Sequence, residues 1–219
     1  VQDVLGDFDG AVSENESKLA TAHGRMEELE LIASDMFDKL VKAGLSPQDS
    51  SMVEKAQGHA QEIVALAEQA IAAGELSVDQ LFDRNYREVP GTNPPLYRTA
   101  LSDWADANWR PLNDRVSGEG GAVIMCSQAD MSGFLPTHVT AHSRQPTGDL
   151  AHDTKYCRNG RIILEGIDHV AKATTDPYTM AVYRQEGDGK NYMVVRNVYV
   201  PLHIGGRRWG DFELAYSFR

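Results

Sequence analysis

The chain has 219 residues and a mass of 24.1 kDa, and its 21 basic and 32 acidic side chains give a formal net charge of −11. With 42% hydrophobic and 24% charged residues it has the composition of a folded protein, large enough for one domain with an appendage or for two small domains. A sequence pI near 5.0 without a basic cluster argues against nucleic-acid binding, because such binding depends on Lys and Arg that neutralise phosphates.

Hydropathy gives no sign of a membrane span. The longest apolar runs, such as residues 63–67 and 122–126, are far shorter than the roughly 20 residues needed to cross a bilayer. The chain begins at Val1 and shows no signal-peptide pattern, so we expect a fragment of a longer protein that makes no membrane contact itself.

Common enzyme motifs are absent. The sequence holds no HExxH, GxSxG, GxxxxGK(S/T) or GxGxxG pattern. Its two cysteines, Cys126 and Cys157, lack CxxC partners, and we expect two free thiols, with a disulfide or paired metal ligation as the alternatives. The absence of CxxCH excludes covalent attachment of c-type haem, which needs two thiols and an adjacent histidine.

Charge and periodicity set the first part of the chain apart. Residues 1–100 carry 8 basic and 18 acidic side chains, for a net charge of −10, whereas residues 101–219 carry 13 and 14. Within residues 5–40, apolar residues recur at alternating steps of three and four, which is the spacing of a coiled-coil seam. The seam consists of Leu5, Phe8, Val12, Leu19, Ala22, Met26, Leu29, Ala33, Met36 and Leu40, with polar Asn15 in the one gap.

A seam of this kind needs a partner helix, so we expect a homodimer through residues 5–40. Acidic residues such as Glu27 and Glu28 lie between the seam positions, as on a solvated outer face. The alternative is a single amphipathic helix that lies on its own domain, because Asn15, Ala22 and Ala33 make the seam thin.

Three more helices are expected before the first strand. Gly44 ends the first helix, and Pro47 begins a second, with the periodic set Val53, Ala56, Ala60, Ile63, Ala67 and Ala70. Residues 77–80 form a capping box that opens a short third helix, and the proline-rich segment 88–95 is a joint. A fourth helical pattern runs from Leu96 to Pro111, where the proline bends or restarts the helix.

The remainder of the chain predicts an antiparallel sheet. Strands are expected at residues 122–127, 134–140, 178–185, 192–204 and 211–218, with glycine turns at 187–189 and 205–206. Loop and short helix between 146 and 176 would cover one face. The fold class is therefore α+β: long N-terminal helices forming a coiled-coil stalk or hairpin at residues 1–76, then a domain at 77–219 with a five-stranded antiparallel sheet.

Short motifs along the second part carry a resemblance to a known family. Residues 130–138 read Asp-Met-Ser-Gly-Phe-Leu-Pro-Thr-His, 145–149 Gln-Pro-Thr-Gly-Asp, 157–162 Cys-Arg-Asn-Gly-Arg-Ile, 183–187 Tyr-Arg-Gln-Glu-Gly and 206–210 Gly-Arg-Arg-Trp-Gly. In this order they resemble the PAS-like, or Cache-like, sensory module of bacterial methyl-accepting chemotaxis proteins, over roughly residues 80–218. The resemblance implies a PAS-like fold for residues 77–219 and a role in chemotaxis signal transduction.

The chain departs from the family pattern at several positions. Ser132 and Phe134 replace the usual Asn and Tyr, Val139 replaces the Asn after His138, and Arg208 replaces a His. Some relatives carry covalent c-type haem, which the missing CxxCH excludes here. Noncovalent haem with His138 as an axial ligand is disfavoured, because a histidine in this setting is more often hydrogen-bonded within the fold. The cofactor therefore stays unassigned. His142, His152, His169 and His203 are too irregularly spaced to define a metal site, so no metal site is expected.

The resemblance also implies where a ligand would bind. Pockets of PAS-like modules lie between the sheet and the helical segment that covers it. Arg158 and Arg161, three apart on an expected helix, would share a face and suit a carboxylate or phosphate. The residues expected to contact a small-molecule ligand are Asp130, Phe134, His138, Arg158, Arg161, Tyr183 and Arg184. The structural alternative pairs Asp130 with Arg158 or Arg161 to lock the first strand to the helix.

These features predict a non-enzymatic sensory domain of a bacterial chemoreceptor, which binds a small molecule or cofactor and passes the signal through a dimeric helical stalk. A ligand-free dimerisation or regulatory domain is the first alternative. An enzyme that uses Asp130, His138 and one of the two cysteines is the second, although no spacing places a thiol near an imidazole. The unpaired cysteines and the stalk favour the cytoplasm, with the periplasm as the alternative.

Overall fold

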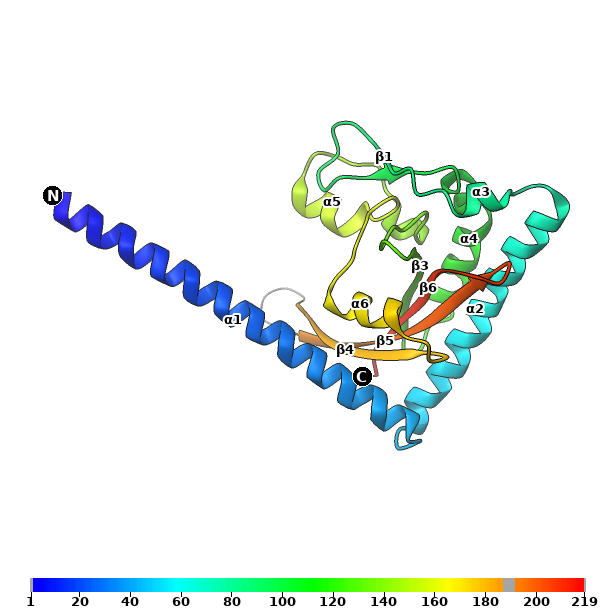
Figure 1. Ribbon diagram of the computed structural model, residues 1–219, viewed down its shortest axis with the longest axis horizontal. Coiled ribbons are helices and arrows are strands. Elements are labelled where there is room, and N and C mark those ends of the chain that lie inside the picture. Colours follow the sequence, from blue (N-terminus) through cyan, green and yellow to red (C-terminus); the bar gives the residue numbers. More distant parts are fainter. Residues whose placement is uncertain (1, 187–191, 219) are drawn as a thin grey trace.

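Two long helices open the chain in the computed structural model, α1 (Gln2–Lys42) and α2 (Pro47–Ala73). They meet at a sharp bend, and the first part of α1 projects away from the body of the protein (Figure 1). Each helix is followed by a glycine with a left-handed backbone, Gly44 at φ 73° and Gly74 at φ 75°. Glycine adopts this conformation without a steric penalty, which is why the expected helix ends are confirmed.

The structure describes the backbone of residues 2–186 and 192–218, and the side chains of residues 11–184 and 193–218. The glycine turn expected at 187–189 and the side chains of Leu5 and Phe8 lie outside the described residues.

A four-stranded antiparallel sheet forms the centre of the molecule. Its strands are β3 (Val123–Asp130), β4 (Thr179–Glu186), β5 (Tyr192–Ile204) and β6 (Arg207–Tyr216), in the order β3-β6-β5-β4. A separate two-stranded sheet pairs β1 (Arg87–Glu88) with β2 (Tyr97–Arg98). The mixed α and β composition, with two long helices before antiparallel sheets, is thus confirmed.

The fifth strand expected at residues 134–140 is not a strand in the structure. Phe134 makes a single antiparallel bridge with Ile162, and the chain then continues as loop into the 3-10 helix η1 (Thr140–His142). Pro136 has no N–H to donate to a strand ladder, so the segment cannot extend this bridge on the side that its nitrogen faces. The sheet therefore has four strands within the described residues rather than five.

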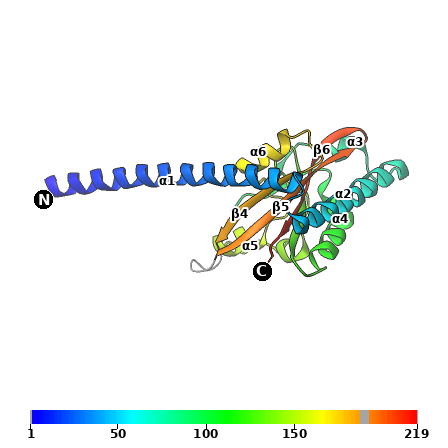
Figure 2. The ribbon, with the colours of Figure 1, turned by 90° about the horizontal axis from the view of Figure 1, so that it is seen from below.

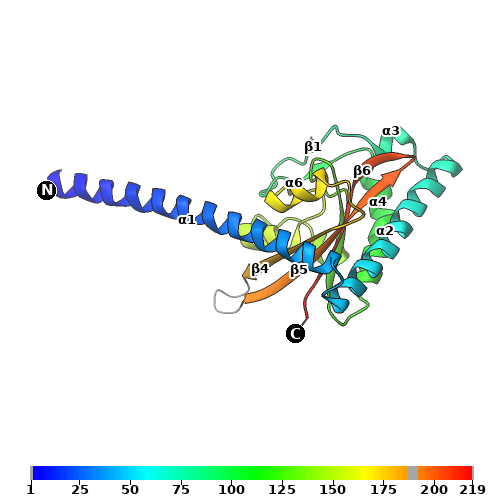
Figure 3. The same ribbon diagram turned by 60° about the horizontal axis from the view of Figure 1, so that its bottom comes forward.

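One face of the sheet packs against α2 and α4 (Ser102–Ser117) to form the main apolar core (Figure 3). Trp109 of α4 lies at its centre, fully buried, and makes edge-to-face contacts with Trp104 and Trp209 at centroid distances of 5.4 and 5.0 Å. The expectation that this helix starts near Leu96 is wrong, because α4 begins at Ser102, and Pro111, where the sequence predicts a bend or restart, lies inside a single helix. The helix continues through Pro111 because Leu112 and Val116, at helical spacing from Trp109, are buried in the same core.

The other face of the sheet is covered by short helices and long loops. Here lie α5 (Leu150–Tyr156) and α6 (Gly166–Ala173), on the side opposite α2 and α4 (Figures 1 and 3). The expected capping box is confirmed at α3 (Val78–Leu81), where Ser77 and Gln80 exchange side-chain and backbone hydrogen bonds of 3.1 and 2.9 Å. The short helices leave much of this cover irregular.

Helix α1 runs along the outer edge strand β4 and seals it (Figure 2). The Ser34 hydroxyl donates to the Val182 carbonyl and accepts from the Val182 N–H, both at 3.1 Å. Asp38 accepts from the Met180 N–H at 2.8 Å. An uncovered edge strand would expose a row of unpaired backbone groups, so these two side chains take the place of a neighbouring strand. The C-terminal part of α1 is thereby fixed to the sheet.

The predicted seam of α1 does not take part in this contact. Its described members all lie exposed, and the larger ones remain far out in solvent, with Leu19 70%, Met26 59% and Met36 60% exposed. The side chains that pack on the sheet, Ser34 and Val41, occupy a different side of the helix. In the structure, the seam therefore does not lie on the chain's own domain.

Replacing Ser34 by alanine tests the edge seal. We expect Ser34→Ala to lower the free energy of unfolding by about 1–3 kcal/mol, because the N–H and carbonyl of Val182 lose their partner. Thr21→Ala on the same helix removes an exposed hydroxyl and serves as the control. Urea unfolding measures both. Equal effects of the two substitutions would show that the seal contributes nothing to stability.

Candidate functional site

The sheet face beneath α6 is polar, in contrast to the apolar face against α2. Because side chains alternate along a strand, every second residue of β4, β5 and β6 points to this side. We call the polar members of this set, together with Ser127 of β3, the polar face: Ser127, Thr179, Tyr183, Asn197, Tyr199, Asp211 and Glu213. In the strand register Glu213 lies between Ser127 and Tyr199, and Tyr199 is next to Thr179. These side chains form one continuous band across all four strands.

The centre of the polar face is a hydrogen-bonded network. The Asn197 side-chain amide donates to the Tyr199 hydroxyl at 3.3 Å and to the Glu213 carboxylate. Asn197 and Tyr199 are both buried. A buried polar group is costly unless it is hydrogen-bonded, so a network at this position specifies one arrangement of the neighbouring strands.

Burial raises the pKa of Glu213 to about 7, and the negative charge of Asp168 on α6 adds to this effect. The pKa of Asp168 is itself raised, mainly because its carboxyl is removed from water. Lys172 and Arg158 act in the opposite direction on Glu213. The Glu213 carboxyl, which lies beneath α6, therefore changes its charge near neutral pH.

Three buried polar atoms near this network have no hydrogen-bond partner within the described part of the chain. They are Nε of Arg158, Oδ1 of Asn197 and Oγ1 of Thr179. The charge of Arg158 influences the pKa of both Tyr183 and Glu213, so its guanidinium lies close to the polar face. Unsatisfied buried groups are rare in folded proteins and cost about 1–3 kcal/mol each. A ligand that offers an acceptor to Arg158 and a donor to Asn197 would satisfy two of them.

One end of the polar face is closed by an ion-pair cluster. Asp211 accepts from Lys172 of α6 at 3.0 Å and from Arg208 at 2.5 Å. Arg208 also donates to the carbonyl of Ala171 at 3.3 Å, which ties α6 to β6. With Ala171 packed on Tyr199 and Ala181, α6 is held down at this end.

Arg158 and Tyr183 are the predicted site residues that the structure places at the polar face, whereas Arg161 turns toward α5. The expected helix over 158–161 is instead a turn after α5, closed by a hydrogen bond from the Arg161 N–H to the Arg158 carbonyl at 3.1 Å. The Arg161 guanidinium donates to the Thr154 carbonyl at 3.3 Å. Gly160 at this turn has a φ of 89°, which a right-handed helix cannot contain. It also approaches the backbone of Tyr97 so closely that a Cβ would lie 2.5 Å from the Tyr97 carbonyl oxygen, so only glycine fits here.

Asp130 and Phe134 instead lock the turn at the end of β3. The Asp130 carboxylate accepts from the N–H groups of Ser132 and Phe134 at 2.8 and 3.0 Å and from the Tyr86 hydroxyl at 2.5 Å. The Tyr86 ring packs on Phe134 at 5.1 Å between centroids. No ion pair joins Asp130 to Arg158 or Arg161 among the described residues.

His138 is buried, and its ring interacts with residues of its own segment. Its Nδ1 accepts from the Val139 N–H at 2.9 Å, and its ring stacks on His142 at 5.3 Å. Burial lowers the pKa of His138 to about 3, so the imidazole is neutral. Arg184 follows Tyr183 in β4, and strand alternation directs its exposed side chain away from the polar face.

Two shallow surface pockets flank β5. One, of about 530 Å³, is lined by the loop 173–177 and Arg208, and the other, of about 490 Å³, lies between α2 and β5. They share Pro177, Pro201 and His203. None of the predicted site residues lines either pocket, but the first is lined by Lys172 and Arg208, the two side chains that pair with Asp211 at one end of the polar face.

Glu213, Asn197 and Tyr199 were not predicted as site residues. The signal was present in the sequence, because Asp211 and Glu213 alternate with apolar Phe212 and Leu214. Alternation of this type usually indicates a solvated face, and only the cover of α6 turns it into a buried site.

No protein-family model matches the chain, and no curated protein matches it either. Among the helices of the described residues, none combines the length and the apolar character that a membrane span needs.

Glu213→Gln tests the charge on the polar face. A carboxyl whose pKa is about 7 in the folded state and 4.5 in the unfolded chain keeps a proton that the unfolded chain loses, so the free energy of unfolding falls as the pH rises from 4.5 to 7. In Glu213→Gln we expect the pH-dependent decrease in the free energy of unfolding to be smaller than in the wild-type chain by roughly 1–3 kcal/mol. Urea unfolding at pH 5 and pH 8 measures it, with exposed Glu75→Gln as the control. An unchanged pH dependence in Glu213→Gln would contradict the assignment.

Proposed function

We propose that the chain is a non-enzymatic sensory module of a bacterial chemoreceptor, built as a PAS-like domain, that binds a small molecule and signals through paired α1 helices. The motifs that carry the resemblance support this proposal, and two of their glycines occupy positions where this structure has no room for a side chain. A Cβ on Gly133 would lie 2.2 Å from the Ile163 carbonyl oxygen, and one on Gly210 would lie 2.0 Å from that of Ala129. Both motif glycines are therefore required by close backbone approach.

The exposed seam of α1 is the observation that carries the proposal. A helix whose large apolar side chains remain in solvent, at heptad spacing, is suited to pairing with a second copy of itself. A different side of the same helix is hydrogen-bonded to β4 through Ser34 and Asp38. Any change in the sheet would therefore act directly on the helix that forms the proposed dimer contact.

The polar face is the proposed ligand site. It offers an unpaired guanidinium nitrogen on Arg158, an unpaired amide oxygen on Asn197 and a carboxyl group on Glu213 that titrates near neutrality. A small molecule with an anionic or polar acceptor group suits this set. The apolar contacts of α6 and the Lys172–Asp211 pair would have to open, or shift, to admit it.

Signalling requires two arrangements of similar energy. A ligand shifts their populations only by the difference in its affinity for the two. A seam with Asn15, Ala22 and Ala33 is weaker than one filled with leucine, which suits an equilibrium that a ligand can shift. The buried free thiols Cys126 and Cys157 favour a cytoplasmic location for the module, with the periplasm as the alternative.

Charge in the seam tests the proposed dimer. We expect the wild-type chain to sediment as a dimer and the double variant Leu19→Glu with Met26→Glu to have a dissociation constant at least about 100-fold higher, because both substitutions place charge in the contact. Ser17→Glu adds the same charge on another side of α1 and should leave the dimer intact. A monomeric wild-type chain at micromolar concentrations would contradict the proposal.

A thermal-shift screen of small carboxylates, phosphates and amines tests the ligand site. We expect at least one compound to raise the melting temperature of the wild-type chain, because a ligand that binds only the folded state stabilises it. Arg158→Gln should abolish the shift, whereas Arg184→Gln should retain it, since that side chain points away from the polar face. No stabilising compound, or equal loss in both variants, would favour a ligand-free dimerisation domain.

A further inference from the structure

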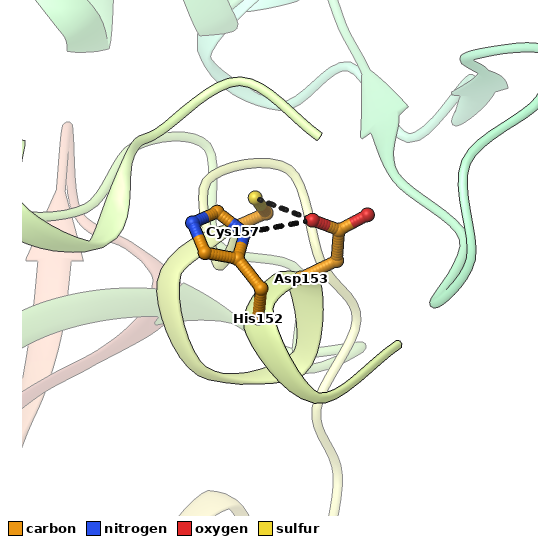
Figure 4. A group of neighbouring side chains, drawn as sticks. All are labelled: His152, Asp153 and Cys157. Carbon is orange, nitrogen blue, oxygen red and sulfur yellow. Dashed lines mark hydrogen bonds and ion pairs between the residues drawn. The ribbon is translucent and has the colours of Figure 1, made fainter. Parts of the chain in front are cut away.

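Three potential metal ligands converge at the end of α5, away from the polar face network. His152 and Asp153 lie in α5, and Cys157 follows its last residue. One ligand atom of each lies within 4.8 Å of the other two (Figure 4). Nitrogen, oxygen and sulfur together are a donor set that Zn²⁺ binds well.

The separations of the donor atoms fit a tetrahedral ion. His152 Nδ1 lies 2.9 Å from Asp153 Oδ1, and Cys157 Sγ lies 3.7 Å from the same oxygen. Around Zn²⁺, with bonds of about 2.0 Å to N and O and about 2.3 Å to S, neighbouring ligand atoms lie roughly 3.3–3.5 Å apart. These two separations each lie within about 0.4 Å of the tetrahedral values. The third pair, His152 Nδ1 and Cys157 Sγ, lies within 4.8 Å, so an ion would draw the imidazole and the thiol toward each other.

The carboxylate of Asp153 is already held in place by the preceding loop. It accepts from the N–H and hydroxyl of Thr147 at 2.9 Å each and from the Gly148 N–H at 2.8 Å. The Gly148 N–H binds Oδ2 and orients the carboxylate from the side away from the cluster, whereas the two Thr147 bonds share Oδ1 with His152 and Cys157.

The cluster is accessible from one side only. Asp153 and Cys157 are buried, whereas the His152 side chain is 28% exposed. An ion can therefore enter past the imidazole and reach a protected thiol. The Cys157 thiol is free, and its Sγ lies 3.7 Å from Asp153 Oδ1.

We propose that His152, Asp153 and Cys157 form a Zn²⁺-type metal site with water as the fourth ligand. On binding, the Cys157 S–H gives up its proton to solvent and the sulfur bonds the metal as thiolate. His152 binds through Nδ1 as neutral imidazole, with its proton on Nε2. The site precedes Arg158 in the chain, so an ion here would also fix the turn that carries this guanidinium toward the polar face.

Titration of the reduced full chain with Co²⁺ tests the site directly. We expect a sulfur-to-cobalt charge-transfer band at one equivalent and its displacement by Zn²⁺. Cys157→Ser should abolish the band, and His152→Ala should weaken Co²⁺ binding at least about 100-fold. Cys126→Ala, which removes the distant thiol of β3, should leave both unchanged. Circular dichroism checks that each variant is folded.

Three results would overturn the proposal. The first is a wild-type chain that shows no charge-transfer band, which would make the cluster a hydrogen-bonded loop anchor only. The second is a band that persists in folded Cys157→Ser. The third is a band lost in folded Cys126→Ala, which would move the thiolate ligand to the core.

Discussion

The contact between α1 and the edge strand β4 is the interaction on which the rest of this structure depends. Ser34 and Asp38 satisfy backbone groups that the edge would otherwise leave unpaired, and the helix becomes in effect an additional element of the sheet. The contact uses only the C-terminal part of α1 and only one of its sides. It thereby fixes the helix while leaving its apolar seam exposed, and this division of surfaces is what makes a sensory role in a dimer physically coherent.

The two faces of the sheet also differ from each other. Its apolar face, with Trp109 and Trp209 in the core, holds α2 and α4. Its polar face is covered less regularly and contains groups that are buried but not fully hydrogen-bonded, such as Arg158 and Asn197. A face of this kind contributes little to stability on its own. It is therefore the part of the molecule where a bound compound would change the balance of energies most.

Local patterns in the sequence predicted much of the fold. The periodic residues of α2, the glycines that end both long helices and the alternation in β5 and β6 reflect short-range chemistry, and the structure agrees with them. Tertiary packing decided the rest: buried Trp109 and Val116 carry α4 through Pro111, and Gly160, at a positive φ and close to Tyr97, lies in a turn where a helix is expected. The polar face was missed because its members, such as Asn197 and Glu213, meet only through strand register and the α6 cover. The division into a stalk at 1–76 and a domain at 77–219 stays a prediction.

Distance measurement between spin labels tests the central claim most directly, namely that two copies pair along the seam while each sheet grips its own helix. A nitroxide on a cysteine that replaces Met26 lies in the seam, on an exposed part of α1 ahead of the β4 contact. The account predicts a narrow distribution of distances between the two copies, only somewhat longer than the roughly 10 Å that separates packed helix axes. A sample with no dipolar coupling between copies, or with a label buried against its own sheet, would contradict it.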